Sequence, residues 1–157
     1  MSFAPAVQRW HFDHVGVVVK SLDKGRWHFI SALGVNEWTD PLEDPLNGVN
    51  LQFGRDASGT VYELLSPLNA ESPVAGTLVA RKNLLNHVAY RIPDLAEAAA
   101  TLREARCFPT ADPKTAIAFG GALIQFFVTP IDTIVELIEA PDFAHDFKFL
   151  SLSQGGR

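Results

Sequence analysis

Cysteine, long hydrophobic runs and an excess of positive charge are all scarce or missing in this sequence. Its single cysteine, Cys107, cannot form a disulfide within the chain, which suits a reducing cytoplasm, and is expected to be a small buried residue. No stretch approaches the roughly 18 uninterrupted apolar residues of a membrane-spanning helix. The 13 Lys and Arg are outnumbered by 18 Asp and Glu, and they form no basic patch in the sequence. These absences argue against membrane and nucleic-acid partners.

The composition is that of a folded, soluble protein. The first ten residues lack a basic start followed by an apolar stretch, so no secretory signal is expected. Hydrophobic residues make up 47% of the 157 residues, which argues against disorder. A chain of this length allows one domain or two small modules that share a core.

Three segments of the chain recur at one constant offset of 73 residues. The matching pairs are 12–17 (FDHVGV) with 85–90 (LNHVAY), 48–53 (GVNLQF) with 121–126 (GALIQF), and 61–65 (VYELL) with 134–138 (IVELI). Chance could produce one such match, but hardly three in the same register. The sequence therefore predicts a tandem duplication.

Each half has the pattern of a strand, a helix and further strands. The strands are expected at residues 14–19 and 87–92 and around Gln52, Glu63, Gln125 and Glu136. This indicates an α+β fold in which a βαβββ unit occurs twice. We expect the first module at residues 10–68, a linking helix at 69–83, the second module at 84–141 and a tail at 142–157.

The helix of the second half has a clear start. Asp94 is expected to cap it, and Glu97 three residues later completes a capping-box pattern. Its apolar face is expected to consist of Leu95, Ala98, Ala99 and Leu102.

The helix of the first half is less sharply marked. Ser21 or Asp23 can cap it, and Gly34 suits its end. Its inward-facing residues are expected to be Trp27, Ile30 and Leu33.

The linker and the tail both have helical patterns. In the linker, Ser72 is expected to cap a helix, Pro73 to occupy its first turn, and Arg81-Lys82 to end it. In the tail, Phe143, Phe147 and Leu150 have i, i+4, i+7 spacing, which favours a short amphipathic helix packed on the body or on a partner subunit.

The duplication relates His14 to His87 and Glu63 to Glu136, with the same spacing of 49 residues in each half. A carboxylate in the middle of a strand either faces solvent or is buried with a partner, because burying it alone costs several kcal/mol. Units related by a pseudo-two-fold axis bring equivalent positions together. Two histidines and two glutamates meeting there would form a mixed nitrogen and oxygen site for one divalent metal ion.

The remaining histidines have no such counterparts. His11 and His28 correspond to Leu84 and Thr101 at the same offset. We expect His11, His28 and His145 to be structural or exposed.

These motifs resemble the vicinal-oxygen-chelate superfamily, which includes glyoxalase I, methylmalonyl-CoA epimerase, extradiol dioxygenases and bleomycin resistance proteins. Residues 12–17 and 86–89 look like the family's first and third metal-ligand strands, and residues 134–139 look like its last. The resemblance covers roughly residues 10–141 and implies paired βαβββ modules forming a metal-centred cup. The ligand order His, Glu, His, Glu resembles that of bacterial glyoxalase I.

The segments between the modules are closer to the methylmalonyl-CoA epimerase branch. Residues 63–67 (ELLSP) and 71–75 (ESPVA) look like that branch. Two departures stand out. Asn86 precedes His87 where the branch usually has a second histidine, and Leu51 stands where a bacterial epimerase has a glutamate proposed as a proton-transfer base.

The resemblance implies a metal-dependent isomerase or epimerase that moves a proton next to a carbonyl. Its cofactor would be one divalent ion (Co, Ni, Mn, Zn or Mg), and Glu63 and Glu136 would be candidates for the base as well as ligands. Gln52 and Gln125 either line the cup or are ordinary outward polar residues.

Two alternatives remain open: a glyoxalase I-type lyase and a non-catalytic protein that binds a small molecule. An extradiol dioxygenase is disfavoured because Glu63 would be a fourth protein ligand. The expected partners are a small-molecule substrate and, by analogy, a second copy of the chain in a homodimer.

Overall fold

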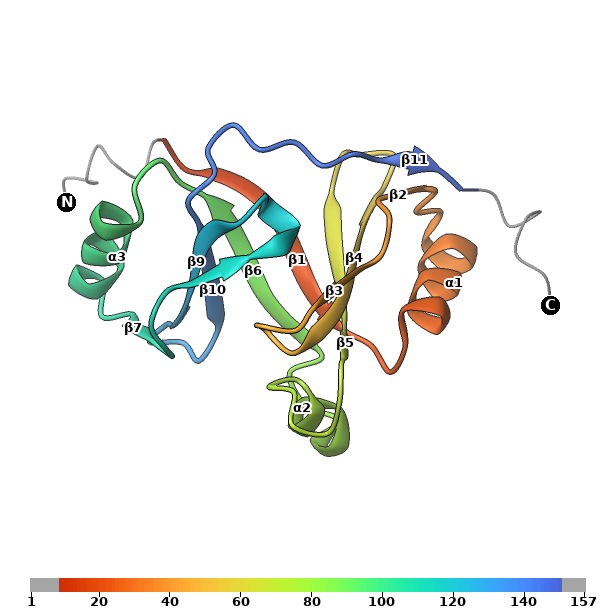
Figure 1. Ribbon diagram of the computed structural model, residues 1–157, viewed down its shortest axis with the longest axis horizontal. Coiled ribbons are helices and arrows are strands. Elements are labelled where there is room, and N and C mark those ends of the chain that lie inside the picture. The colour runs from red at the N-terminus through yellow and green to blue at the C-terminus, as the bar shows by residue number, and fades with distance from the viewer. Residues whose placement is uncertain (1–8, 151–157) are drawn as a thin grey trace. The chain divides into compact units, whose positions relative to one another are not determined.

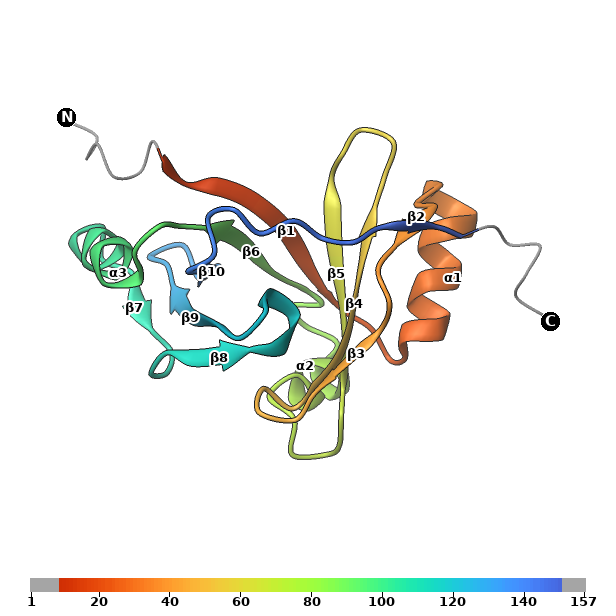
Figure 2. The ribbon, with the colours of Figure 1, turned by 45° about the horizontal axis from the view of Figure 1, so that its top comes forward.

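The computed structural model describes residues 9–150, which divide into two compact units (Figures 1 and 2). We call residues His14–Leu85 together with 144–150 the first unit, and residues 9–13 together with Asn86–Phe143 the second unit. Both contain a mixed sheet and few helices, which is the α+β class that the sequence predicts. The expectation about a secretory signal and the last part of the predicted tail concern residues outside those described.

The first unit is built around one sheet with the strand order β11-β2-β4-β5-β1, and β3 lies beside β4. Strands β1 and β5 are parallel, and the other pairs are antiparallel. Its elements are β1 (His11–Val18, from residue 14), α1 (Leu22–Leu33), β2 (Glu37–Trp38), β3 (Leu42–Asp44), β4 (Val49–Arg55), β5 (Val61–Pro67), α2 (Ala75–Ala80) and β11 (Lys148–Phe149).

The second unit repeats this plan. Its strand order is β6-β10-β9-β7 with β8 beside β9, and here β6 and β10 are the parallel pair. Its elements are β6 (Leu85–Arg91, from residue 86), α3 (Leu95–Glu104), β7 (Phe108–Pro109), β8 (Lys114–Ala116), a 3-10 turn (Ile117–Phe119), β9 (Ala122–Val128) and β10 (Ile134–Ile138). The two units therefore have matching topologies, as a duplication requires.

The match extends to the hairpin loops between the last two strands of each unit. In the first unit, the N–H of Gly59 donates to the carbonyl of Asp56 at 3.0 Å. In the second, the N–H of Asp132 donates to the carbonyl of Thr129 at 3.0 Å, and both positions are 73 residues further along. Gly59 and Asp132 have φ angles of 88° and 59°, a left-handed conformation that glycine and aspartate tolerate better than most residues.

Helix α3 follows the sequence prediction. The Asp94 side chain accepts the backbone N–H of Glu97 at 2.8 Å and so caps the helix. Leu95, Ala98 and Ala99 are buried in a cluster that also contains the free Cys107. The cysteine is therefore a buried core residue.

Helix α1 has the predicted ends but only part of the predicted inner face. Ser21 caps it by accepting the N–H of Lys24 at 3.3 Å, and Gly34 ends it with a φ of 68°. However, Trp27 and Leu33 are 63% and 56% exposed.

Ile30 packs partly buried against the core, as predicted, and the fully buried residues of α1 are Gly25 and Phe29. A Cβ atom on Gly25 would lie 2.9 Å from the Cγ1 atom of Val19, so the missing side chain allows the helix to approach the sheet closely. The prediction failed for Trp27 and Leu33 because Gly25, which marks the buried face of the helix, carries no hydrophobic signal in the sequence.

The linking helix is shorter than predicted. Helix α2 covers Ala75–Ala80, and the residue at its N-cap, Val74, has no side-chain capping bond. Ser72 lies in the preceding turn, where its hydroxyl accepts the N–H of Val74 at 3.4 Å. Arg81 follows the helix with a φ of 51°, so the basic pair stands beyond the last turn.

The described part of the tail is extended and not helical, so that prediction was wrong. Residues Lys148–Phe149 form β11, which pairs antiparallel with β2. The N–H of Leu150 donates to the carbonyl of Asn36 at 2.7 Å. Pairing with a sheet edge satisfies the backbone of this segment, whereas a helix this short would be marginal alone. Among residues 9–150, no helix is both long and apolar enough to cross a membrane.

Candidate metal centre

His14 and Glu63 form a buried pair in the first unit. They stand on the adjacent parallel strands β1 and β5, where Gly16 is opposite Glu63. Because residues two apart share a face of a strand, His14 lies on the face that carries the glutamate. The His14 Nε2 and Glu63 Oε2 atoms are 3.1 Å apart, and the two residues are 0% and 5% exposed.

His87 and Glu136 form the same pair in the second unit. They stand on the parallel strands β6 and β10, where Ala89 is opposite Glu136. The His87 Nε2 and Glu136 Oε2 atoms are also 3.1 Å apart, and the residues are 4% and 3% exposed. The equal spacing in the sequence thus corresponds to two equal pairs, and the solvent-facing reading of both glutamates is wrong.

An aromatic ring contacts each histidine. Phe53 is directly opposite Glu63 in the β4–β5 ladder, and its ring centroid lies 5.2 Å from that of His14 in an edge-on arrangement. Phe126 is opposite Glu136, 5.3 Å from the ring of His87. These phenylalanines were not predicted as site residues, although their 73-residue offset was a signal.

Asn86 orients the imidazole of His87. Its Oδ1 atom lies 2.9 Å from His87 Nδ1. An amide oxygen only accepts, so this bond requires a proton on Nδ1 and leaves Nε2 as the ring nitrogen that faces Glu136. A hydrogen bond to the other ring nitrogen is the usual support of a metal-binding histidine.

Asp13, the counterpart of Asn86 at the same offset, has another role. Its buried carboxylate pairs with Arg91, with 3.0 Å between Oδ2 and Nε. The Nη1 atom of Arg91 donates to the carbonyls of Pro141 and Phe143 at 2.8 and 2.9 Å. This network holds the end of the second unit in place.

The residues present fit a divalent metal ion. In the second unit the His87 lone pair and the Glu136 carboxylate face each other, which is favourable only with a proton or a cation between them. In both pairs the nitrogen and oxygen atoms are 3.1 Å apart, so the two donors of each pair could bind the same cation. Imidazole and carboxylate donors together suit first-row divalent metals.

Gln52 and Gln125 are neither cup-lining nor outward residues. Gln52 is opposite Leu64, so it lies on the face away from the glutamate. It is 2% exposed and accepts a hydrogen bond from Arg26 Nη1 at 2.7 Å. Gln125, 6% exposed, donates to the carbonyl of Ala111 at 3.0 Å. Both are buried structural residues.

The other three histidines are exposed or packed on the protein, as expected. His11 and His28 are exposed. His145 is half-buried, and its ring centroid lies 4.2 Å from that of Phe53. The sequence could not reveal this contact, because His145 has no counterpart in the repeat.

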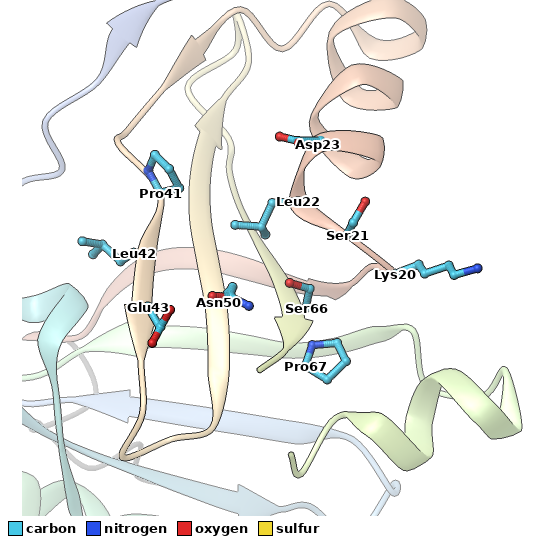
Figure 3. Close-up of a pocket in the computed structure, with 10 residues that line it drawn as sticks. All are labelled: Lys20, Ser21, Leu22, Asp23, Pro41, Leu42, Glu43, Asn50, Ser66 and Pro67. Atoms are coloured by element: carbon cyan, nitrogen blue, oxygen red, sulfur yellow. The ribbon is translucent and has the colours of Figure 1, made fainter. Parts of the chain in front are cut away.

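A shallow cavity of about 460 Å³ lies elsewhere in the first unit (Figure 3). Asn50 and Ser66 are opposite each other in its wall. Each is an odd number of residues from Phe53 or Glu63 on its strand, so the cavity opens on the other face of the sheet. Its lining residues are Lys20, Ser21, Leu22, Asp23, Pro41, Leu42, Glu43, Asn50, Ser66 and Pro67. The His–Glu pair is not part of it.

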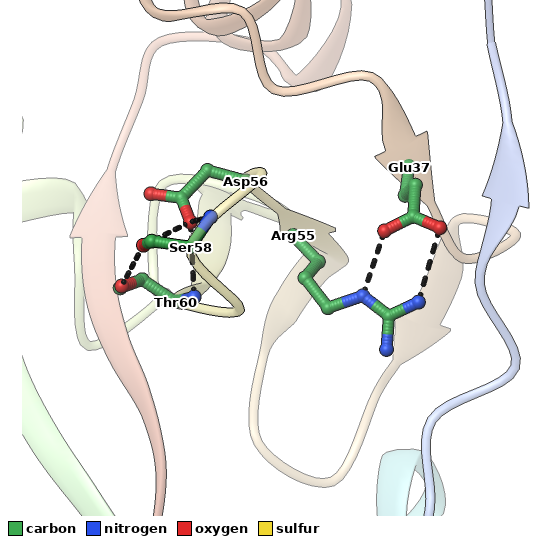
Figure 4. A network of polar contacts seen from close by, with 5 residues as sticks. All are labelled: Glu37, Arg55, Asp56, Ser58 and Thr60. Carbon is green, nitrogen blue, oxygen red and sulfur yellow. Dashed lines mark hydrogen bonds and ion pairs between the residues drawn. The ribbon is translucent and has the colours of Figure 1, made fainter.

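Arg55 and Glu37 join β4 to its neighbour β2 (Figure 4). Arg55 Nε and Nη2 donate to the two Glu37 carboxylate oxygens at 2.8 and 3.1 Å. These hydrogen bonds lower the pKa of Glu37 and raise that of Arg55. The Arg55 guanidinium also lies 4.5 Å above the ring of Phe147 in the tail.

Asp56 organises the neighbouring loop (Figure 4). Its Oδ1 atom accepts the Ser58 hydroxyl at 2.6 Å, the Ser58 N–H at 2.9 Å and the Thr60 N–H at 3.0 Å. The hydroxyl bond from Ser58 is the main cause that lowers the pKa of Asp56.

Comparison with known proteins agrees with this geometry. Residues 13–126 match the family described as the glyoxalase/bleomycin resistance protein/dioxygenase superfamily. The chain is 32% identical over 132 residues to the mitochondrial methylmalonyl-CoA epimerase of Bos taurus, covering 82% of this chain and 73% of that protein. It is 33% identical over 107 residues to an ethylmalonyl-CoA/methylmalonyl-CoA epimerase of Cereibacter sphaeroides, covering 65% of this chain and 77% of that one.

A solved structure shows the same fold. The crystal structure of a selenomethionine methylmalonyl-CoA epimerase matches with a TM-score of 0.67 and 28% identity, over 81% of this chain and 92% of that one. The motifs around His14, His87 and Glu136 thus pointed to the right family. The chain belongs to the glyoxalase/bleomycin resistance protein/dioxygenase superfamily, where its relatives include methylmalonyl-CoA epimerases.

Proposed function

We propose that this protein is a metal-dependent epimerase that moves the proton next to the carbonyl of a 2-substituted acyl-CoA thioester such as methylmalonyl-CoA. The observation that carries the proposal is the pair of equal, buried His–Glu contacts, each with 3.1 Å between nitrogen and oxygen. The names of relatives that are 32% and 33% identical support the substrate class.

The two pairs would together hold one divalent ion. All four residues are buried, and each offers one ligand atom: His14, Glu63, His87 and Glu136. In symmetric oligomers, equivalent positions come together at the symmetry axis; by analogy, we propose that the duplicated pairs share one ion rather than bind two. When bound, the ion would stabilise negative charge on a substrate oxygen. Cobalt, nickel, manganese, zinc and magnesium are the candidates.

The chain's own residues would handle the proton. A carboxylate of the site, Glu63 or Glu136, takes the α-proton: the C–H bond breaks, its electron pair enters the enolate, and the carboxylate becomes protonated. Leu51, which is 3% exposed and cannot carry a proton, stands where a bacterial epimerase has its proposed base.

The test follows one epimer of methylmalonyl-CoA in deuterium oxide by NMR, with protein loaded with cobalt. We expect the α-proton signal to disappear and the other epimer to appear, at rates far above the protein-free control. Removing the ion with a chelator should stop both processes, and adding cobalt back should restore them. Exchange that survives chelation would refute the metal role.

Metal binding is tested separately, in the absence of substrate. The wild-type protein should bind about one divalent ion per chain, and His87→Ala should lose most of it. The matched control is His28→Ala, an exposed histidine of α1 that should bind metal as the wild type does. A wild-type protein that stays metal-free with every candidate ion would refute the proposal.

A glyoxalase-type lyase is the second candidate, because the donor set of two histidines and two glutamates favours it. Turnover of an α-ketoaldehyde–thiol adduct, without exchange of the acyl thioester, would select this candidate. A protein that binds its metal and a ligand but catalyses neither reaction would be a binding module. By analogy with relatives, we further propose that the protein forms a homodimer, which sedimentation at micromolar concentration would test. We also propose that it acts in the cytoplasm.

A further inference from the structure

We infer that His145 is the second proton carrier of the proposed epimerisation, delivering a proton to the face of the carbon opposite the glutamate that removes one. The inference rests on the proposed function and deepens it. It begins from the segment Ala144–Leu150, which we call the strap.

The C-terminal end of the strap is bonded to strand β2 and its neighbouring residues. Strand β11 pairs with β2, with Lys148 opposite Trp38. The Lys148 ammonium lies 2.7 Å from a carboxylate oxygen of Asp40. These contacts, with the backbone bond from Leu150, give the preceding residues a defined place on the sheet.

That place is the face that carries His14 and Glu63. Phe53 and Arg55 share this face, because residues two apart on a strand point the same way. Arg55 lies 4.5 Å from the ring centroid of Phe147, and His145 lies 4.2 Å from that of Phe53. The strap thus brings its aromatic side chains onto the ligand face of the sheet.

One aromatic ring connects His145 to the pair. Phe53 contacts His145 on one side and meets the ring of His14 edge-on, with 5.2 Å between centroids. It is also directly opposite Glu63 in the β4–β5 ladder. His145 is half-buried, so part of its ring remains accessible to solvent.

The other titratable groups on this face have defined structural roles. Asp44, opposite Val49, accepts the backbone N–H and side-chain amide of Asn47 at 3.1 and 2.8 Å. Glu37 forms two hydrogen bonds with Arg55. Histidine is the side chain best suited to both give and accept a proton near neutral pH.

Inversion at carbon needs such a group. After a carboxylate has taken the α-proton from one face, the imidazolium of His145 donates its N–H proton to the other face. The N–H bond breaks, the C–H bond forms with the electron pair of the enolate, and the neutral imidazole later regains a proton from solvent while the carboxylate returns its own. Without the second group, the carbon is reprotonated only on its original face.

The test separates exchange from inversion. One epimer of methylmalonyl-CoA is incubated in deuterium oxide with the cobalt-loaded wild type, His145→Phe and His145→Gln. Phenylalanine keeps an aromatic contact with Phe53, and glutamine keeps polarity, so at least one variant should fold normally. We expect inversion to fall about 100-fold or more, while deuterium still enters the starting epimer within a few-fold of the wild-type rate.

A second readout does not depend on catalysis. Cobalt affinity and the visible cobalt spectrum should be unchanged in both variants, because His145 is not a ligand. His28→Phe is the matched control for replacing a histidine and should retain inversion. Exchange and inversion falling together, inversion unaffected, or lost cobalt affinity would each overturn the role of His145. Absence of exchange in the wild type would instead refute the proposed function.

Discussion

Replacing Asn86 by alanine should weaken metal binding without touching a proposed ligand. Asn86 accepts the Nδ1–H of His87 at 2.9 Å and thereby keeps the Nε2 lone pair directed at Glu136. A neutral hydrogen bond contributes about 1 kcal/mol, and one that involves a charged group about 1.5–3 kcal/mol. Metal coordination makes the imidazole N–H a stronger donor, so the larger range applies. The expected loss of affinity is therefore about 10- to 100-fold.

The assay is a cobalt titration followed by visible absorption, at one pH and ionic strength. Asn86→Asp is the rescue variant, because a carboxylate can accept the same N–H, and it should recover most of the affinity. In the metal-free protein, nitrogen-15 NMR should find the His87 proton on Nδ1 in the wild type and distributed over both nitrogens in Asn86→Ala. Wild-type affinity in Asn86→Ala, or an unchanged tautomer, would refute the reasoning.

Three further changes test the site and the fold. Glu63→Gln should keep part of the metal affinity, since an amide oxygen can still coordinate, but should lower proton exchange more than metal occupancy; an equal loss of both would contradict its proposed role as base. Gly25→Ala should lower the free energy of unfolding by about 1–3 kcal/mol, because its Cβ would lie 2.9 Å from Val19 Cγ1; denaturant unfolding measures this, and an unchanged midpoint would show that the helix can shift. Asp56→Ala should be less stable than the wild type at neutral pH. Because the pKa of Asp56 is lowered in the folded protein, mainly by Ser58, the advantage is present above the unfolded pKa of about 3.9 and disappears as the pH falls through the folded pKa. A stability difference that persists in acid would argue against this role.

The repeat made most of the architecture predictable. A constant offset fixes which strands correspond, and the alternation of residues along a strand then fixes which side chains share a face. His14 and Glu63 could therefore be identified as a pair without knowing the fold. The helix ends at Gly34 and Asp94 were predictable too, because capping depends on residues only a few positions apart. The start of α1 was narrowed only to Ser21 or Asp23, and the structure selects Ser21.

Features that depend on distant or unrepeated contacts could not be predicted. The spacing of Phe143, Phe147 and Leu150 matches a helix, but the free edge of β2 stabilises an extended strand instead. Similarly, the ring contact between His145 and Phe53 joins residues 92 positions apart, and neither the local pattern nor the repeat indicates it.

Internal comparison of the two units shows where the site is symmetric and where it is not. The His–Glu pairs and the phenylalanines beside them occur in both units with nearly equal distances. The residue preceding each histidine differs: Asn86 binds the imidazole of His87, whereas Asp13 binds Arg91. The strap also reaches only one of the two phenylalanines, Phe53, among the described contacts. The two equal His–Glu pairs suit one ion with equivalent ligands. The residues around them differ between the units, which suits a substrate whose two faces contact different groups.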